Sequence, residues 1–545
     1  MSVIHKEKAV RIKMGMLAGA VALVAAQASP AAAAESNWSR QIGKPISAKQ
    51  LRLPADAGPV RLGRAAIERR ISRLGTLSTV ARLSAKPPGG RRTTTVRFRQ
   101  TLDGRRVLWS QLNALVAGSK VMSISGTVVP LKGTDVTGKR RISAAQAQRT
   151  ARNAVAGAMR LRPAEFVVYA GDPDKPRHPR NAYVVEVTTP EPGADDTPTV
   201  CVVVDAETGK VLKKWRGSAA RIGAQARGAK RLSQAKNVLV QVADNKSGNI
   251  DLANDGVNFF TTGNPYSWGT GSATRQREQF GSPSSAFLAS PGQPFGQIGS
   301  VTQHFCLKRK YCGRDSGLPG PVGGGNVNRW FFSARFGGCR RGVCNTSHYD
   351  PGLDRVFLTV ADQDDADTIG HEVGHVIDEH FQDDYVDNFE GSEVSEALGE
   401  MFSYDYSFKT KFGTGVAVGD LLAAPNLFTF PLDGQIPQKM SQFKCNAQDV
   451  HTNGYILAHA YWKWIEEMNA RGVSGRTVAG NLLQQIPFQL AAARTFGDTR
   501  AAFLSVIKAS FGTDHPVFDA YIQGFGHETN ILFKHSRTQL GCSKK

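Results

Sequence analysis

The chain has 545 residues and a formal net charge of +22, and this length exceeds one compact domain and predicts three or four folding units. The charge is uneven: residues 35–220 hold 33 Lys and Arg against 14 Asp and Glu, whereas residues 221–545 hold 31 of each. Between Asp350 and Asp405 there are 17 acidic residues and a single base, Arg355. Such a segment repels phosphates, which argues against a nucleic-acid-binding protein.

Residues 1–34 have the pattern of a secretory signal peptide. Four basic residues from Lys6 to Lys13 precede a short apolar run, Met14–Ala26, and Ala32–Ala34 supplies small residues for cleavage. The run is too short and too rich in Ala and Gly for a convincing membrane span, although an uncleaved anchor is the alternative. We therefore expect an exported, extracellular protein with no membrane attachment after cleavage.

Residues 35–220, here called the leader, have the pattern of a small α+β region. Alternating apolar and polar residues predict strands, and an Ala-rich stretch predicts a helix capped by Ser143. The expected elements are strands at Thr95–Gln100, Val107–Trp109 and Val121–Gly126, a helix over about Ser143–Met159, and strands at Ala182–Val187, Val200–Asp205 and Val211–Trp215.

After the leader, the composition of the chain predicts three successive segments. Residues 217–237 are rich in Ala, Gly, Arg and Lys without apolar periodicity, which predicts an exposed processing linker. Residues 237–332 are rich in Gly, Ser and Asn with short apolar runs such as Val238–Val242, which predict strands and loops. The C-terminal part predicts mainly helices, for example Ile456–Met468, Val478–Gln485 and Thr499–Ser510.

Six cysteines lie in the second part of the chain, an even number that predicts disulfides in an exported protein. Of the roughly fifteen possible pairings, we expect Cys306–Cys312 and Cys339–Cys344 as local loops and Cys445–Cys542 near the C-terminus. A cysteine zinc site is the alternative, although the spacings differ from the short pairs of such sites. Cys201, in the leader, is the odd cysteine.

The segment His371-Glu372-Val373-Gly374-His375 has the spacing of a hydrolytic zinc site. On a helix, residues four apart lie one turn apart on the same face, so both histidines can bind one metal ion. Glu372 then projects beside the metal, where it can take a proton from a zinc-bound water. A surface helix with two ordinary histidines is the alternative.

A catalytic zinc site needs a third protein ligand. Glu396 and Glu400 are four apart and share a helix face, so one can bind the metal while the other accepts a hydrogen bond from a ligand histidine. Glu393, one turn before Glu396, is the competing ligand. His380 lies off the ligand face and His459 lies among apolar neighbours, so both are expected to be structural.

The stretch Ser395–Phe402 resembles the thermolysin family of zinc peptidases. In that family the two-histidine helix is followed, about twenty residues on, by a helix carrying Glu-x-x-x-Asp; Glu396 lies twenty-one positions after the second histidine. The resemblance implies that His371, His375 and Glu396 bind zinc and that Glu372 is the general base.

Further positions carry the resemblance. Glu400 stands where the family usually has Asp, and is implied to hold a ligand histidine. His451, in a Val-His-x-Asn segment, takes the place of the family's histidine that stabilises the transition state, with Asp449 orienting its ring; an ordinary loop histidine is the alternative. Tyr385 is implied to assist the oxyanion, and Asn345 to bind the substrate backbone.

The leader also carries a resemblance. Val96–Gly104 looks like the fungalysin–thermolysin propeptide motif, and Val204–Leu212 looks like the end of a PepSY domain. The resemblance implies that residues 35–220 are an inhibitory and chaperone propeptide, joined by the linker 221–237 to a zinc metallopeptidase domain at 238–545. The implied fold is α+β: small α+β propeptide domains, then a two-lobed thermolysin-like domain with a β-rich N-terminal and a mainly helical C-terminal lobe.

The resemblance implies a secreted zinc endopeptidase made as an autoinhibited zymogen. Its partners would be protein or peptide substrates and its own propeptide, and we expect a monomer. The basic leader and the acidic segment suggest docking by charge, as a hypothesis. An exported zinc hydrolase of another substrate class (ester or cell-wall amide) and a non-catalytic zinc-binding protein are the alternatives.

Calcium is a second expected ion, because thermolysin-like enzymes bind it and this chain has an acidic cluster. The available residues are Asp362, Asp364, Asp365, Asp367, Asp383, Asp384 and Asp387. No loop has the spacing of a known calcium motif, so a solvated acidic surface is the alternative.

Overall fold

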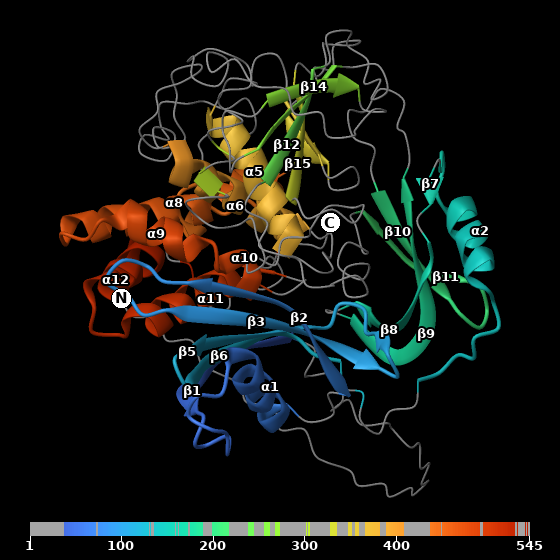
Figure 1. The fold of residues 1–545 in the computed structure, drawn as a ribbon, viewed down its shortest axis with the longest axis horizontal. Coiled ribbons are helices and arrows are strands. Elements are labelled where there is room, and N and C mark those ends of the chain that lie inside the picture. Colours follow the sequence, from blue (N-terminus) through green and yellow to red (C-terminus); the bar gives the residue numbers. More distant parts are fainter. Residues whose placement is uncertain are drawn as a thin grey trace, which may run out of the picture. The chain divides into compact units, whose positions relative to one another are not determined.

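The computed structural model describes the leader, parts of the segment that follows it, and the helical C-terminal part (Figure 1). The described residues are 37–216 with gaps at 72–74, 130, 132–135, 159, 162, 173–174 and 189–198; 238–244, 256–261, 268–272, 301, 304–305, 328–334, 347–350 and 355–358; 366–381, 389–407 and 437–531 with gaps at 448–449, 491–493 and 529–530; and 540 and 542. The expected signal segment 1–34 and the residues 217–237 lie outside them.

The first part of the leader is an antiparallel sheet with one helix against it. Its strand order is β1-β6-β5-β3-β2, and β4 pairs with β3. The elements are β1 (Asn37–Ser47), α1 (Pro59–Arg70), β2 (Thr76–Ala85), β3 (Thr93–Leu102), β4 (Arg105–Arg106), β5 (Gln111–Ala117) and β6 (Lys120–Thr127). Leu62 and Ala66 of α1 share one core with Phe98. Gly63 permits this approach, because a Cβ there would lie 2.9 Å from that of Ala114.

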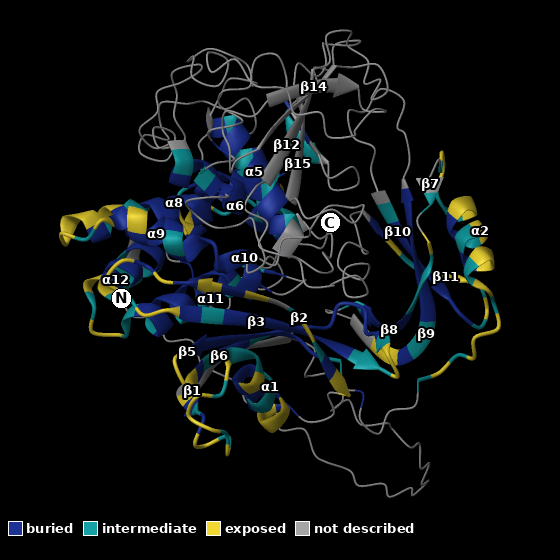
Figure 2. Ribbon diagram, viewed as in Figure 1, coloured by how far each residue is buried: buried dark blue, intermediate teal, exposed yellow. Residues whose placement is uncertain are grey.

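Alternation along β3 produces two different buried faces. Val96 and Phe98 belong to the apolar core beneath α1, whereas Thr93, Thr95 and Arg97, which alternate with this face, are polar. All five are at most 1% exposed, and β3 is almost entirely buried in Figure 2. The polar face of β3 is therefore covered as well.

The second part of the leader is another antiparallel sheet, of order β11-β10-β9-β7 with β8 on β9. The elements are α2 (Ala144–Ala154), β7 (Arg160–Leu161), β8 (Glu165–Asp172), β9 (Lys175–Thr188), β10 (Thr199–Asp205) and β11 (Val211–Arg216). Ser143 caps α2 in a capping box with Gln146, as the sequence predicts for Ser143. Ala147 and Ala151 of α2 share a core with Val185.

A third sheet follows, with order β14-β13-β12-β15-β17-β16. Its strands are β12 (Val238–Asp244), β13 (Gly256–Thr261), β14 (Trp268–Ser272), β15 (Asn328–Ala334), β16 (His348–Asp350) and β17 (Arg355–Phe357). The pairs β12–β15 and β15–β17 are parallel and the others antiparallel. β12 confirms the strand expected at Val238–Val242.

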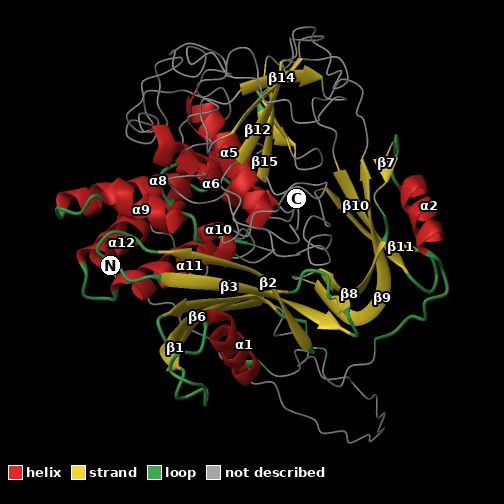
Figure 3. Cartoon of the chain, in the orientation of Figure 1, coloured by secondary structure: helices red, strands yellow, loops and turns green. Residues whose placement is uncertain are grey.

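The C-terminal part is mainly helical, as Figure 3 shows. Its elements are α5 (Ala366–Phe381), α6 (Phe389–Ser407), η5 (Met440–Gln442), α8 (Val450–Ala470), α9 (Gly475–Leu483), α10 (Ile486–Gln489), α11 (Phe496–Phe511), α12 (Pro516–Tyr521) and the π-helix η6 (Ile522–Glu528). Apolar residues of these helices form the largest core. The expected disulfide Cys445–Cys542 is present, with Cα atoms 5.1 Å apart; the other two expected pairs lie outside the described residues.

The β-rich N-terminal region and the helical C-terminal region confirm a mixed α and β protein, whereas the two-lobed thermolysin-like arrangement stays a prediction. Among the described residues, no helix is long and apolar enough to span a membrane. The strand expected at Val107–Trp109 is wrong. Val107 forms a single bridge to Val168, and Trp109 lies in a turn with φ 60°, where its buried ring packs against Tyr169 and Trp215. The expected helix to Met159 ends earlier, at Ala154.

Asp205 holds the turn between β10 and β11. Its Oδ1 accepts hydrogen bonds from the backbone N–H groups of Glu207 (2.9 Å) and Thr208 (2.8 Å), and its Oδ2 accepts one from Arg180 (2.7 Å). Burial raises the pKa of Asp205, but the two backbone hydrogen bonds and the nearby Arg180 outweigh burial and lower it below its usual value. The ionised carboxylate therefore stabilises the folded turn.

We expect Asp205→Ala to lower the free energy of unfolding by about 2 kcal/mol at pH 7, because a buried charged acceptor is lost. A lowered folded-state pKa gives stability that is present above the unfolded-state pKa and lost as pH falls through the folded-state value. The difference in the free energy of unfolding between the wild type and Asp205→Ala should therefore become smaller below about pH 4. Denaturant unfolding at pH 7 and pH 3 checks this; Glu207→Ala, which removes an exposed ion pair with Arg141, should change stability little.

Candidate metal centre

Helix α5 carries both histidines of the His-Glu-x-x-His segment on one face. The helix forms because Ile369, Val373 and Ile377, spaced four apart, are buried in the largest core. The histidines on its other side are therefore one turn apart, with their Nε2 atoms separated by 2.9 Å.

Helix α6 crosses α5 at very short range. A Cβ on Gly374 would lie 2.9 Å from the Cα of Gly399, and a Cβ on Gly399 would lie 2.9–3.1 Å from ring atoms of His371. The two glycines thus remove the side chains that would otherwise separate the helices. Consequently the face of α6 that carries Glu396 lies directly against the histidines.

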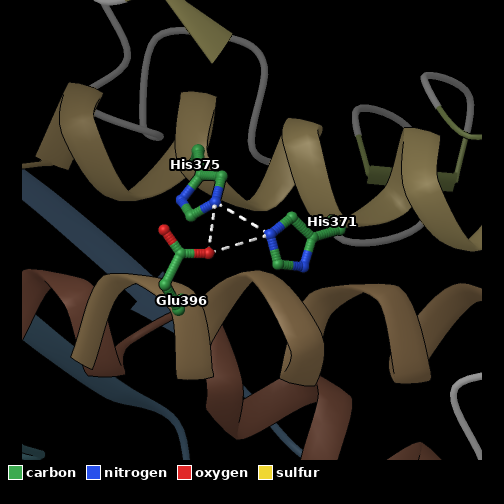
Figure 4. Close-up of side chains that lie close together, drawn as sticks. All are labelled: His371, His375 and Glu396. Atoms are coloured by element: carbon green, nitrogen blue, oxygen red, sulfur yellow. Dashed lines mark hydrogen bonds and ion pairs between the residues drawn. The ribbon is translucent and has the colours of Figure 1, made fainter. Parts of the chain in front are cut away.

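Glu396 completes a triangle with the two histidines (Figure 4). Its Oε2 lies 3.2 Å from Nε2 of His371 and 3.3 Å from Nε2 of His375. Within the described part of the chain, these three residues form a group whose ligand atoms all lie within 4.8 Å of one another and could hold a metal ion.

Two further predicted residues lie beside the triangle. Glu400 Oε1 is 3.2 Å from Nδ1 of His371, the nitrogen that faces away from the triangle. His451, on α8, has its Nε2 2.9 Å from Glu396 Oε2, and its ring stacks with that of His371 at a centroid distance of 5.9 Å. The structure therefore brings residues from three helices to one point.

Glu372 and Glu393 are both buried but have different surroundings. Glu372 is 5% exposed, and its Oε2 has no hydrogen-bond partner within the described residues. Glu393, the competing ligand, instead accepts a 2.7 Å hydrogen bond from Nδ2 of Asn453. The structure thus places Glu396, and not Glu393, against the histidines.

A buried polar chain that the sequence did not reveal supports His375. Its Nδ1 lies 3.2 Å from Oγ of Ser395, which donates to Oδ2 of Asp378 at 2.9 Å. Oδ1 of Asp378 accepts a 2.6 Å hydrogen bond from Arg494, whose Nε donates to the carbonyl of Gly391. The only sequence signals were local: Asp378 is one helical turn after His375, and Ser395 precedes Glu396.

Charges within the cluster oppose the effect of burial. Burial lowers the pKa of His371, but hydrogen bonds to Glu396 and Glu400 outweigh burial and raise this pKa well above its usual value. Burial raises the pKa of Glu396, whereas the charge of His375 and hydrogen bonds from the three histidines lower it well below its usual value. The cluster therefore favours positive charge at its centre, whether protons or a cation.

Several predicted site residues lie outside the described residues: Tyr385, Asp449, Asn345 and the calcium candidates Asp362, Asp364, Asp365, Asp383, Asp384 and Asp387. The remaining calcium candidate, Asp367, is buried in the first turn of α5. His459 is buried, with Nδ1 3.0 Å from the carbonyl of Gln438, which agrees with a structural histidine.

Comparison with known proteins identifies one segment of the leader. Residues 141–215 match PepSY, described as "Peptidase propeptide and YPEB domain", so this segment, which contains α2 and β7 to β11, is a PepSY domain. Among solved structures, the C-terminal domain of Bacillus megaterium YpeB matches with 15% identity over 32% of this chain and 68% of that chain, with a TM-score of 0.17. No curated protein matches the chain.

We expect Ser395→Ala to weaken metal binding about tenfold, because His375 loses the hydroxyl that orients its ring. Competition with a chelator, using zinc as the probe, measures the dissociation constant. Ser403→Ala is the matched control on α6, since its hydroxyl donates to the carbonyl of Asp367 away from the cluster. Equal affinities in all three proteins would show that Ser395 does not position the ligand.

Gly399→Ala should destabilise the protein, although alanine normally stabilises a helix interior by about 1 kcal/mol relative to glycine. The new methyl group would overlap the ring of His371, so metal affinity should fall as well. Thermal unfolding and chelator competition check both effects. Gly58→Ala, where a Cβ has no atom within 4 Å, is the control and should be nearly neutral. A higher melting temperature for Gly399→Ala would contradict the close helix crossing.

Proposed function

We propose that the chain is the precursor of a secreted zinc-dependent endopeptidase. The observation that carries the proposal is the convergence of His371, His375 and Glu396 beside the buried carboxylate of Glu372. Two imidazole nitrogens and one carboxylate oxygen are the donor set of hydrolytic zinc sites, which keep a fourth position for water. When bound, zinc would supply a Lewis acid that lowers the pKa of that water to about 7.

The protein groups then have separate tasks. Glu372, with one oxygen available, accepts a proton from the attacking water and delivers it to the departing amine. His451 is 44% exposed, against 12% and 15% for the two ligand histidines, so it lies at the open side of the cluster. From there it donates a hydrogen bond to the oxygen on which negative charge develops. Glu400 holds His371 in the ligand orientation.

The PepSY domain supports a peptidase over other zinc hydrolases, because its family is described as a peptidase propeptide. Residues 35–220 would then be an inhibitory leader, removed by cleavage near residues 217–237. The mature part would act on peptide bonds of protein substrates outside the cell.

We expect Glu372→Gln to lower peptide cleavage at least about a hundredfold while zinc content is unchanged, because the general base is removed and the ligands stay. Secreted wild type and variant are compared by intact mass, zinc content and cleavage of a protein substrate. The wild type should lose its leader near residues 217–237 and the variant should stay full-length. Glu466→Gln, on the exposed side of α8, is the matched control and should behave as the wild type.

Substantial peptide cleavage by Glu372→Gln would show that another group is the base. A wild type that binds no zinc would refute the proposal as a whole. Zinc-bound wild type that hydrolyses small esters or peptidoglycan but not peptides would point to a zinc hydrolase of another substrate class.

A further inference from the structure

The polar face of the leader's first sheet contacts residues 485–490, which include the short helix α10. Side chains from β3, β5 and β6 donate hydrogen bonds to four consecutive backbone carbonyls of this segment. The pairs are Arg97 Nη2 with Pro487 O (3.4 Å) and Phe488 O (2.9 Å), Asn113 Nδ2 with Gln489 O (3.3 Å), Ser125 Oγ with Gln489 O (2.9 Å), and Gln111 Nε2 with Leu490 O (2.7 Å).

These carbonyls lie in and directly after a very short helix. The last carbonyls of any helix have no partner inside the helix, and α10 has only four residues. Its carbonyls therefore need donors from elsewhere. The leader supplies these donors, so its side chains bind specifically to the C-terminal end of α10.

Side chains of the segment also donate in the opposite direction. Nε2 of Gln485 donates to Oγ1 of Thr93 at 2.9 Å, and Nε2 of Gln489 donates to Oγ1 of Thr95 at 2.6 Å. A surface that fits the leader must thus present these backbone carbonyls and two amide side chains four residues apart.

Burial makes the fit selective. Arg97 is 1% exposed and Asn113 0%, and the guanidinium of Arg97 lies 4.3 Å from the centre of the Phe488 ring. Buried polar groups are strongly unfavourable unless they are hydrogen-bonded. The leader face therefore disfavours any covering surface that lacks the matching carbonyls and amides.

We propose that this face of the leader is a recognition surface for residues 485–490, and that it keeps the leader bound as a separate chain after the connection is cut. The inference rests on the cleavage expected under the proposed function, and adds the binding partner and its chemistry. That chemistry is hydrogen bonding to backbone carbonyls, with Arg97 as the charged donor in these pairs, rather than attraction between a basic leader and the acidic segment.

The test uses the full chain with Glu372→Gln and a site for a sequence-specific protease inserted within residues 217–237. After cutting by the added protease, the leader should remain with the C-terminal part during gel filtration, at both 0.05 M and 0.5 M salt. Arg97→Met should weaken this association at least about tenfold, because a buried charged donor is lost. Arg64→Met, a leader arginine on α1 with the same charge change, should leave the association unchanged.

Release of the unmodified leader at 0.05 M salt would overturn the proposal, as would retention of Arg97→Met with unchanged affinity. Release at 0.5 M salt, with Arg97→Met and Arg64→Met weakened alike, would show that net charge holds the leader. If Arg97→Met does not fold, Ser125→Ala removes a single donor and should weaken binding about threefold or more. No step needs zinc or catalysis, so failure here leaves the proposed function standing.

Discussion

The close crossing of α5 and α6 is the constraint on which the candidate metal centre depends. Gly374 and Gly399 bring the two helix backbones together, and each lies one turn after a residue of the triangle, His371 and Glu396. A larger residue at either glycine would move the carboxylate away from the imidazoles. The chemistry of the site therefore depends on two positions that themselves carry no functional group.

A second constraint is the buried pair of Asp378 and Arg494, whose side chains are only 1–2% exposed. It links α5 to the segment before α11, and through Ser395 it reaches the ring of His375. Such a pair is costly to bury, and losing one partner leaves an uncompensated charge in the interior. The pair of Asp378 and Arg494 thus fixes one arrangement of the helices around the histidines, in addition to any effect on stability.

Local patterns in the sequence predict most of the described elements of the leader and the residues of the triangle. Four-residue spacing on a helix predicts which side chains share a face, so spacing and resemblance together predict His371, His375, Glu396 and Glu400. The roles of Gly399 and Arg494 could not be predicted in this way, because they depend on which segments meet in space. The wrong strand at Val107–Trp109 has the same origin: three apolar residues indicated a strand, but tertiary packing of Trp109 produces a buried turn.

In the leader, the docking force suggested by composition differs from the contacts seen in the structure. The alternation along β3 predicts a strand, and the structure confirms it; the alternation does not predict that Thr93, Thr95 and Arg97 are buried against residues 485–490. The excess of Lys and Arg in the leader suggested charge as the docking force, but net charge acts at long range and does not specify a position on the surface. Directional hydrogen bonds to successive carbonyls do specify one. The basic residues outside this contact speed the approach of the leader to the acidic segment. The buried hydrogen-bond donors determine the position in which the leader finally docks.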